Sequence, residues 1–294
     1  MSKPLKIPFQ QLLDALLDES TPLNPRYLYR LSDLNDEESA GLQEIWPRIA
    51  PSRRKALLED LDEIGANDYL LSFEAVARMA LQDPEPVVRR SAIRILLEYE
   101  VLDLIPQFIG TLNTDTDASV RAAAATALGQ YVYLGEIEEI SEEDLTDIVD
   151  NLLRVVQGQD ADIVRQRALE SLGFSGREEV PPLIVSAYNS NDKEWVAASL
   201  FAMGRSADQQ WVDIVMSMIN NPYPAIRLEA VRAAGELEIT DAVDPLLELL
   251  DDAHEDVRDA AIWSLSQIGG EGVRKTLEKL QEETDDDEEV EFIE

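Results

Sequence analysis

The strongest constraint on this chain is a sequence frame that recurs along most of its length. In residues 115–129, DTDASVRAAAATALG, an acid precedes Val-Arg, and small and apolar residues follow at fixed distances. With Arg121 as position 0, Asp115 lies at −6, Ala124 at +3 and Gly129 at +8. At about 100° per residue, positions −1, +3, +4, +6, +7 and +10 share one face, which predicts an amphipathic helix. Its small residues would let a neighbouring helix approach closely.

Seven copies of this frame can be aligned. Position 0 falls at residues 54, 89, 121, 165, 196, 227 and 258, so the steps are 35, 32, 44, 31, 31 and 31 residues. Three equal steps of 31 residues are hard to obtain by chance. The copy at Arg54 is weak, and in another copy Val196 replaces the arginine while Ser190 replaces the acid. A first helix followed by this signature helix, repeated about seven times, predicts an all-α solenoid.

The pattern divides the chain into three predicted regions. Residues 1–50 form a helical cap over the first repeat, residues 51–283 form the repeat array, and residues 284–294 form an acidic tail. The tail favours a mobile end, with the start of a truncated capping helix as the alternative. The 44-residue step contains an insertion at 131–145, which predicts a surface excursion or, alternatively, a loop that contacts a partner.

The charge of the chain excludes some classes of function. Asp and Glu number 60 against 25 Lys and Arg, a formal net charge of −35. A field of this sign repels phosphate backbones and anionic lipid, so we expect neither nucleic acid nor membrane as the partner. The acidity is typical of a solvated outer face, and attraction to a basic partner is the alternative reading.

The chain has no cysteine, and it lacks an apolar run of signal-peptide or membrane-span length, so we expect a cytoplasmic protein.

The frame D-x-x-x-x-V-R-x-x-A-x-x-A-L-G, as it stands at 115–129, resembles the HEAT repeats of the phycobilin-lyase-like class. The resemblance covers roughly residues 50–283. It implies a right-handed α-solenoid with first helices on the convex side and signature helices on the concave side. It also implies a scaffold or binding platform, although some proteins of this class assist chromophore attachment to phycobiliproteins, some are iron-dependent hydroxylases and some are DNA glycosylases.

The residues argue against the enzymatic branches of that class. The iron-dependent members use several His-Glu pairs, whereas this chain has one histidine, His254, followed by Glu255. One such pair supports neither a di-iron nor a zinc site, so we predict no metal and no cofactor. The glycosylases need a cationic groove, which the charge opposes. Phosphate-binding, nucleophile-elbow and dinucleotide motifs are absent from the sequence, and we predict that the chain is not an enzyme.

The signature arginines could form a row of ligand contacts, but a repeat-defining residue is expected to support stacking first. We therefore predict a structural ladder in which arginines pair with turn acids of their own or neighbouring repeats. Its members are Asp83, Arg89, Asp115, Arg121, Arg165, Arg227, Asp252 and Arg258.

Positions +5 and +9 of each signature helix lie one turn apart, away from the packed face. They predict a concave strip for a partner, composed of Arg94, Glu98, Glu170, Phe174, Phe201, Arg205, Arg232, Glu236 and Trp263, with Thr126, Gln130 and Gln267 at the remaining places. Aromatic and arginine side chains commonly anchor protein interfaces, which favours a peptide- or protein-binding groove. The alternative is that Phe201 and Trp263 fold back into the core. The strip therefore predicts a non-catalytic scaffold, with an accessory factor or lyase subunit for bilin attachment as the alternative. The sequence leaves the oligomeric state open, and a monomer is favoured.

Overall fold

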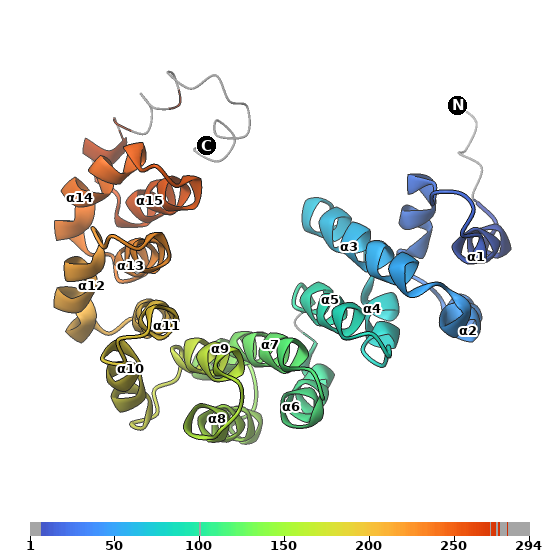
Figure 1. Ribbon diagram of the computed structural model, residues 1–294, viewed down its shortest axis with the longest axis horizontal. Coiled ribbons are helices and arrows are strands. Elements are labelled where there is room, and N and C mark those ends of the chain that lie inside the picture. The colour runs from blue at the N-terminus through green and yellow to red at the C-terminus, as the bar shows by residue number, and fades with distance from the viewer. Residues whose placement is uncertain (1–6, 100, 271, 275, 277–280, 282–294) are drawn as a thin grey trace. The chain divides into compact units, whose positions relative to one another are not determined.

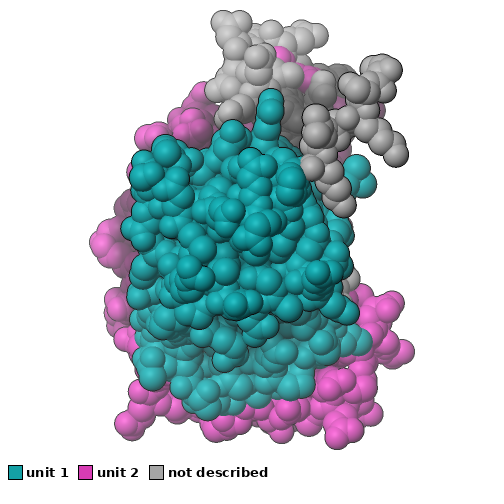
Figure 2. All heavy atoms as spheres, turned by 90° about the vertical axis from the view of Figure 1, so that its right-hand side faces the viewer, with its two compact units in different colours: residues 1–131 teal, residues 132–294 magenta. Residues whose placement is uncertain are grey.

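The computed structural model describes residues 7–99, 101–270, 272–274, 276 and 281, and every regular element among them is a helix (Figure 1). The predicted all-α fold of repeated helical hairpins is confirmed. The chain separates into two compact units, residues 1–131 and 132–294, which Figure 2 colours teal and magenta.

Unit 1 contains the helices that precede and include the first regular repeats. They are α1 (Phe9–Leu17), the 3₁₀ turns η1 (Pro25–Leu31) and η2 (Trp46–Arg48), α2 (Asp36–Ile45), α3 (Pro51–Asn67), α4 (Glu74–Ala80), α5 (Pro86–Leu96), η3 (Leu102–Leu104), α6 (Ile105–Thr114) and most of α7 (Ala118–Glu136). Local chemistry accounts for several starts. Asn35 and Glu38 form a capping box on α2. Pro51 and Pro86 occupy the first turns of α3 and α5, where a missing N–H costs nothing.

Unit 2 contains the more regular part of the array. Its remaining helices are α8 (Glu142–Gln157), α9 (Asp162–Leu172), α10 (Val180–Tyr188), α11 (Lys193–Arg205), α12 (Val212–Met218), α13 (Pro224–Glu236), α14 (Val243–Glu248) and α15 (Glu255–Ile268), with the 3₁₀ turns η4 (Gln209–Trp211), η5 (Thr240–Ala242) and η6 (Leu249–Asp251). The signature helices α9, α11, α13 and α15 pack side by side in one row, here called the signature row. Each packs against its own first helix, α8, α10, α12 or α14 (Figure 1).

The face predicted to be apolar is buried. In the copies centred on residues 89, 121, 165, 227 and 258, positions −1, +3, +6 and +7 are all buried. Valine or isoleucine at −1 and alanine at +3 provide the small, smooth contact surface of each signature helix. Burial of this stripe removes apolar area from water at every repeat boundary, which is the main favourable term in a stacked array.

Glycine at +8 sets how closely neighbouring signature helices approach. A Cβ added at this position would lie within 3 Å of the backbone Cα at +6 of the next repeat. These distances are 2.8 Å from Gly173 to Ala202, 2.9 Å from Gly204 to Ala233 and 2.7 Å from Gly235 to Ser264. Real Cβ atoms essentially never come this near to another backbone, so the spacing of the signature row requires glycine.

These glycines lie at or near the ends of their signature helices, but they do not make the turn that follows. In two repeats the left-handed backbone conformation falls three residues later, at Ala207 and Glu238, each with φ of 51°. Glycine therefore serves close packing in this array, and a non-glycine residue makes the turn at the end of the helix. Left-handed φ is unfavourable for such residues. Both are exposed, and each turn is held by a backbone hydrogen bond, which the N–H of Ala207 donates to Gly204 and that of Glu238 to Gly235.

The insertion at 131–145 does not form the predicted loop. The helix α7 continues to Glu136 and α8 begins at Glu142, so most of the extra residues lengthen two helices and leave a short connection. Ser141 caps α8 by accepting a hydrogen bond from the N–H of Asp144. The cap and array boundaries at residues 50 and 51 stay a prediction, and the predicted tail, 284–294, lies outside the described residues.

The close packing at glycine predicts that two Gly→Ala substitutions change the free energy of unfolding in opposite directions. Gly235→Ala should lower the free energy of unfolding by about 1–2 kcal/mol, because the overlap with Ser264 outweighs alanine's better helix propensity. Gly110→Ala in α6 is the matched control, since nothing lies within 4 Å of its added Cβ, and it should be stabilising by about 0.5–1 kcal/mol. Urea unfolding of both variants measures the difference, and stabilisation at both positions would contradict the packing account.

Candidate functional site

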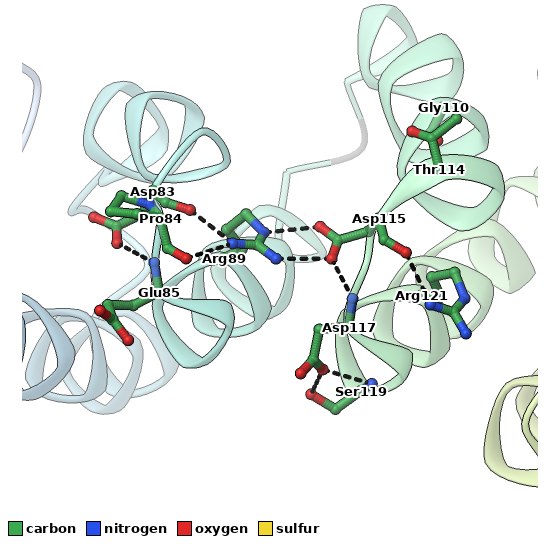
Figure 3. Close-up of polar contacts among 10 residues, drawn as sticks. All are labelled: Asp83, Pro84, Glu85, Arg89, Gly110, Thr114, Asp115, Asp117, Ser119 and Arg121. Carbon is green, nitrogen blue, oxygen red and sulfur yellow. Dashed lines mark hydrogen bonds and ion pairs between the residues drawn. The ribbon is translucent and has the colours of Figure 1, made fainter.

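An ion-paired link joins consecutive repeats at the turns before the signature helices (Figure 3). The guanidinium of Arg89 donates two hydrogen bonds to the carboxylate of Asp115, Nε to Oδ2 and Nη2 to Oδ1, both at 2.7 Å. Its Nη1 donates to the backbone carbonyl oxygens of Asp83, at 2.8 Å, and of Pro84. One arginine therefore holds the turn of its own repeat and the acid of the next, and the bidentate geometry fixes both.

The same arrangement recurs elsewhere in both units. Arg227 donates two hydrogen bonds to Asp252, at 2.8 and 2.9 Å, and one to the carbonyl oxygen of Asn221 at 2.7 Å. These hydrogen bonds hold the pKa of the Asp252 carboxyl below its ordinary value. In unit 1, Arg54 forms a buried ion pair with Asp83, with Nε 2.8 Å from Oδ2.

Each signature arginine can make two contacts, one with a backbone carbonyl oxygen of its own turn and one with the aspartate of the next repeat. The contact with the backbone carbonyl occurs in more of the repeats. Arginine at position 0 donates to the carbonyl oxygen at −6 of its own repeat in four copies, Arg89, Arg121, Arg227 and Arg258.

The pairing runs from position 0 of one repeat to position −6 of the next. Ser190 therefore stands where an acid would accept hydrogen bonds from Arg165 of the preceding repeat. The replacement of that acid is not related to the replacement of arginine by Val196, because Ser190 and Val196 would belong to two different pairs. Arg165 instead donates to the carbonyl oxygen of Val156, pairs with Asp162 and lies over the ring of Trp195, 5.0 Å from its centroid.

The predicted strip divides between the two units. In unit 1, Arg94 pairs with Asp62 at 2.5 Å, and the exposed Glu98 lines a hollow of about 290 Å³ with Tyr69 and Tyr99. Thr126 is exposed and Gln130 is half-buried.

In unit 2 the strip residues meet. The Arg205 guanidinium lies over two rings, 5.2 Å from the Phe174 centroid and 5.1 Å from the Phe201 centroid, and its Nη1 is 3.2 Å from Glu236. Tyr133 extends this layer, with its ring 5.5 Å from that of Phe174. Cation–π contacts of this kind contribute about 0.5–1 kcal/mol each at exposed sites. The rings of Phe174 and Phe201 are half-buried, so they are neither core residues nor fully exposed, whereas Tyr133 is exposed.

Three glutamates lie partly buried between the arginines of this layer. Glu170 pairs with Arg167 at 2.5 Å, and Glu229 pairs with Arg232 at 3.4 Å. The Oε2 atom of Glu229 is buried and accepts no hydrogen bond from the part of the chain that the structure describes. Burial raises the pKa of Glu170 to about 7 despite the opposing charge of Arg167. Burial likewise raises the pKa of the Glu229 carboxyl.

The third glutamate, Glu236, shows the same effect. Burial raises its pKa to about 7 against the nearby charge of Arg205, and Glu229 adds repulsion. Its Oε2 lies only 2.5 Å from where a Cβ on Gly204 would be, so the carboxylate fills the space that the glycine leaves. The close packing of the helices and the position of this acid are therefore linked.

A hollow of about 510 Å³ opens between α11, α13 and α15. Its lining contains four strip residues, Arg205, Arg232, Glu236 and Trp263, together with Asp256, Asp259 and Ala260. This size lies within the range of ligand-binding clefts. Gln267, the last strip residue, is exposed.

Sequence reasoning missed several members of this site. Arg167 and Glu229 occupy position +2, three residues before +5, so they share its side of the helix. Asp259 occupies +1, an outward position that the strip did not include. Arg167 and Glu229 could have been identified from the sequence, because residues three positions before +5 lie on the same side of the helix. Tyr133 lies in the insertion, outside the repeat frame, and had no such signal.

Two properties of the described residues bear on other kinds of site. No helix in that part of the chain is both long enough and apolar enough to cross a membrane. The same residues contain no cluster of three or more His, Cys, Asp or Glu side chains arranged to hold a metal ion. His254 lies exposed in the turn before α15, and its N–H donates to Asp252.

Consecutive pairs of helices, repeated with the Asp, Arg and Gly roles described above, define a helical-repeat protein. The family model for HEAT repeats matches residues 74–142 and 212–291, together just over half of the chain. The chain therefore belongs to the HEAT-repeat family. It is 28% identical over 165 residues to the uncharacterized phycocyanin operon protein Z of Pseudanabaena tenuis, a match that covers 55% of this chain and 78% of that protein.

Solved structures with some likeness to the chain include YibA of Escherichia coli and human deoxyhypusine hydroxylase in complex with glycerol. The first is 16% identical, with 94% of this chain and 97% of that chain covered and a TM-score of 0.46. The second is 17% identical, with coverages of 88% and 95% and a TM-score of 0.38.

The Arg89–Asp115 link generates a prediction about coupling between repeats. The two side chains are 13% and 10% exposed, so Asp115→Ala should destabilise the protein by about 3 kcal/mol. A double-mutant cycle with Arg89→Ala should return a coupling energy of about 1–3 kcal/mol. Asp150→Ala is the control, because its pair with Arg177 is well exposed and should be worth less than about 1 kcal/mol. Equal losses at both aspartates would show that the link between repeats contributes nothing special.

The raised glutamate pKa values predict a pH-dependent stability. Because folded Glu170 and Glu236 bind protons more tightly than unfolded glutamate, their favourable contribution is complete below about pH 4.5 and is lost as pH rises through about 7. The free energy of unfolding should therefore fall by about 2 kcal/mol or more between pH 5 and pH 7.5.

The variant Glu170→Gln/Glu236→Gln should flatten this decline, whereas the exposed pair Glu178→Gln/Glu248→Gln should not. Denaturant unfolding at several pH values measures the slope. An unchanged slope in the first variant would contradict the assignment to these two carboxyls.

Proposed function

We propose that this chain is a cytoplasmic, non-catalytic scaffold that binds a protein or peptide along the outward face of the signature row. The observation that carries this proposal is the convergence of strip residues from three successive signature helices on one hollow, which contains Arg205, Arg232, Glu236 and Trp263. Arginine and tryptophan are enriched at the energetic centres of protein interfaces. A repeat array offers such positions in series, and a partner can contact several of them at once.

The layer beside the hollow supports the same proposal. Phe174, Phe201 and Arg205 hold one another in place, so these side chains lose little freedom when a partner binds. The protein as a whole carries −35 charges, which favours approach of a basic partner over an acidic one.

The second candidate is an accessory factor or lyase subunit for bilin attachment to a phycobiliprotein. The observation that favours it is the similarity to a protein named for a phycocyanin operon. Co-expression of the chain with a phycocyanin subunit and bilin distinguishes the two candidates. A coloured covalent adduct that depends on this chain supports the second candidate and contradicts a purely non-catalytic scaffold.

Site-specific photo-crosslinking tests the scaffold function in the native cells. A photoreactive residue at Arg232 or Gln267, both exposed on signature helices, should capture the same protein. The matched controls are Asp213 and Glu248, exposed on the first helices α12 and α14, which should not capture it. Equal capture from both sets of positions would contradict binding along the signature row.

Purified components then measure the contribution of the aromatic side chains. The variant Phe201→Ser/Trp263→Ser should weaken binding of the captured protein at least about tenfold, as expected when two interface anchors are lost. Its melting temperature should stay close to that of the parent protein, because both rings are half-buried. A stability loss of several kcal/mol, typical of truncated core aromatics, would show instead that these rings are core residues.

A further inference from the structure

Each signature helix of unit 2 can be held to the next one at two places, near its C-terminal end and near its N-terminal end. Near the C-terminal end, glycine at +8 lies against the backbone of the next signature helix at all three steps of the row. Near the N-terminal end, the arginine at position 0 can reach an acid at −6 of the next repeat. The glycine contact is present at every step, so differences between the steps arise from the contact at the N-terminal end.

The N-terminal contact differs from step to step. Between α13 and α15, Arg227 donates two hydrogen bonds to Asp252, and these side chains are only 12% and 8% exposed. Between α9 and α11, Ser190 stands in place of the acid. Between α11 and α13 both members of the pair are replaced, by Val196 and Asn221. The sequence therefore provides no such ion pair on either side of α11.

Cation–π contacts take the place of the missing ion pairs. The Arg165 guanidinium lies 5.0 Å from the ring centroid of Trp195, and the Lys193 ammonium lies 3.4 Å from that of Tyr223. In both contacts a cation of one repeat meets a ring of the next. Lys193 and Tyr223 are exposed, and an exposed cation–π contact holds its partners less firmly than a bidentate ion pair that is shielded from water.

The turn that enters α11 lacks the constraints found in the two turns that follow it. Residues 189–194 are exposed throughout, and Asn191 among them has a left-handed φ of 61°. The side chains of Ser190 and Asp192 accept hydrogen bonds from N–H groups two or three residues further on, which stay within the turn and the first turn of α11. Two prolines restrict φ in the turn into α13, and the ion pair described above holds the turn into α15.

We infer that α11 is the hinge of unit 2: its N-terminal end moves relative to α9 and α13, while the glycine contacts near its C-terminal end act as the pivot. Gly204 and the 3.2 Å ion pair between Arg205 and Glu236 hold that end against α13. The hinge lets the signature row change its curvature without separating the packed glycines. The inference concerns the free protein, so it is tested without a partner.

Amide hydrogen exchange followed by NMR tests the hinge in the full chain. The variant Val196→Arg/Asn221→Asp supplies both members of the missing pair, at the positions that Arg227 and Asp252 occupy one repeat later. It should slow exchange at residues 197–199, near the start of α11, by at least about tenfold, because openings of that end become rarer. Exchange at residues 202–204, beside the pivot, should change much less. Each single substitution supplies one member of the pair only and should slow exchange less than about threefold.

The chain has no cysteine, so spin labels can be placed at chosen positions to measure the row directly. Ile163 and Asp256 are exposed at position −2 of α9 and α15, and Ile163→Cys/Asp256→Cys marks the two ends of the row. Electron paramagnetic resonance should give a broad distance distribution, which narrows when Ser190→Asp and Val196→Arg/Asn221→Asp are added.

A matched control makes the same kinds of substitution on the first helix α10 and at its end. The variant Val185→Arg/Ser186→Asp/Asn189→Asp changes three exposed residues outside the signature row, and it should leave the distance distribution unchanged. The reverse variant, Asp252→Ser, should create a second hinge and speed exchange at residues 259–261 of α15 by at least about fivefold. It keeps the test valid if the restored variants do not fold, which circular dichroism verifies.

Three results would overturn the inference: equally broad distance distributions with and without the restored pairs, unchanged exchange at residues 197–199 in Val196→Arg/Asn221→Asp, or unchanged exchange at residues 259–261 in Asp252→Ser. None of them bears on crosslinking from Arg232 and Gln267. Failure of the hinge therefore leaves the proposed scaffold function intact, and failure of the crosslinking leaves the hinge.

Discussion

The close approach of neighbouring signature helices is the constraint on which unit 2 depends. Glycine at +8 lies against the backbone at +6 of the next helix, at separations that leave no room for a Cβ. Long side chains at +5 and +9 can therefore reach across to the neighbouring repeats, as Arg205 reaches Phe174 in the preceding repeat and Glu236 in the next. With wider spacing the same side chains would extend separately into water. The outward layer and the hollow are thus consequences of how tightly the backbones pack.

The arginine at position 0 provides a second connection between repeats, because it binds the turns that precede the signature helices. It always has a backbone carbonyl to bind, whereas the carboxylate that it meets in the next repeat is present at only some steps. Where Asp115 or Asp252 supplies that carboxylate, the arginine is bidentate. Where Ser190 stands, Arg165 turns to Trp195 and Asp162. The contact with the carbonyl oxygen at −6 therefore recurs in four copies of the frame, whereas the side-chain contact between repeats varies from step to step.

Much of the fold was predictable from the sequence, because a 31-residue period and a small-residue stripe both require stacked helical pairs. The stripe identified the buried positions, since burial follows helical geometry directly. The insertion was less predictable, because residues 131–136 and 142–145 extend helices although they interrupt the period. The site was predictable only in part. Positions +5 and +9 identified Arg205 and Trp263. Two features were not predictable: that each arginine pairs with the acid of the next repeat, and that residues at position +2 join the site. Both depend on how far neighbouring repeats are shifted along each other, which a single sequence does not show.

Gly204 affects both the packing of the helices and the position of the Glu236 carboxylate. Its missing side chain admits the backbone of Ala233 and also the carboxylate of Glu236, which in turn holds Arg205 beside its two rings. A larger residue there would separate the helices and displace the acid in one step. Helix packing and the geometry of the proposed binding layer are consequently not independent at this position, although glycine itself contributes no functional group.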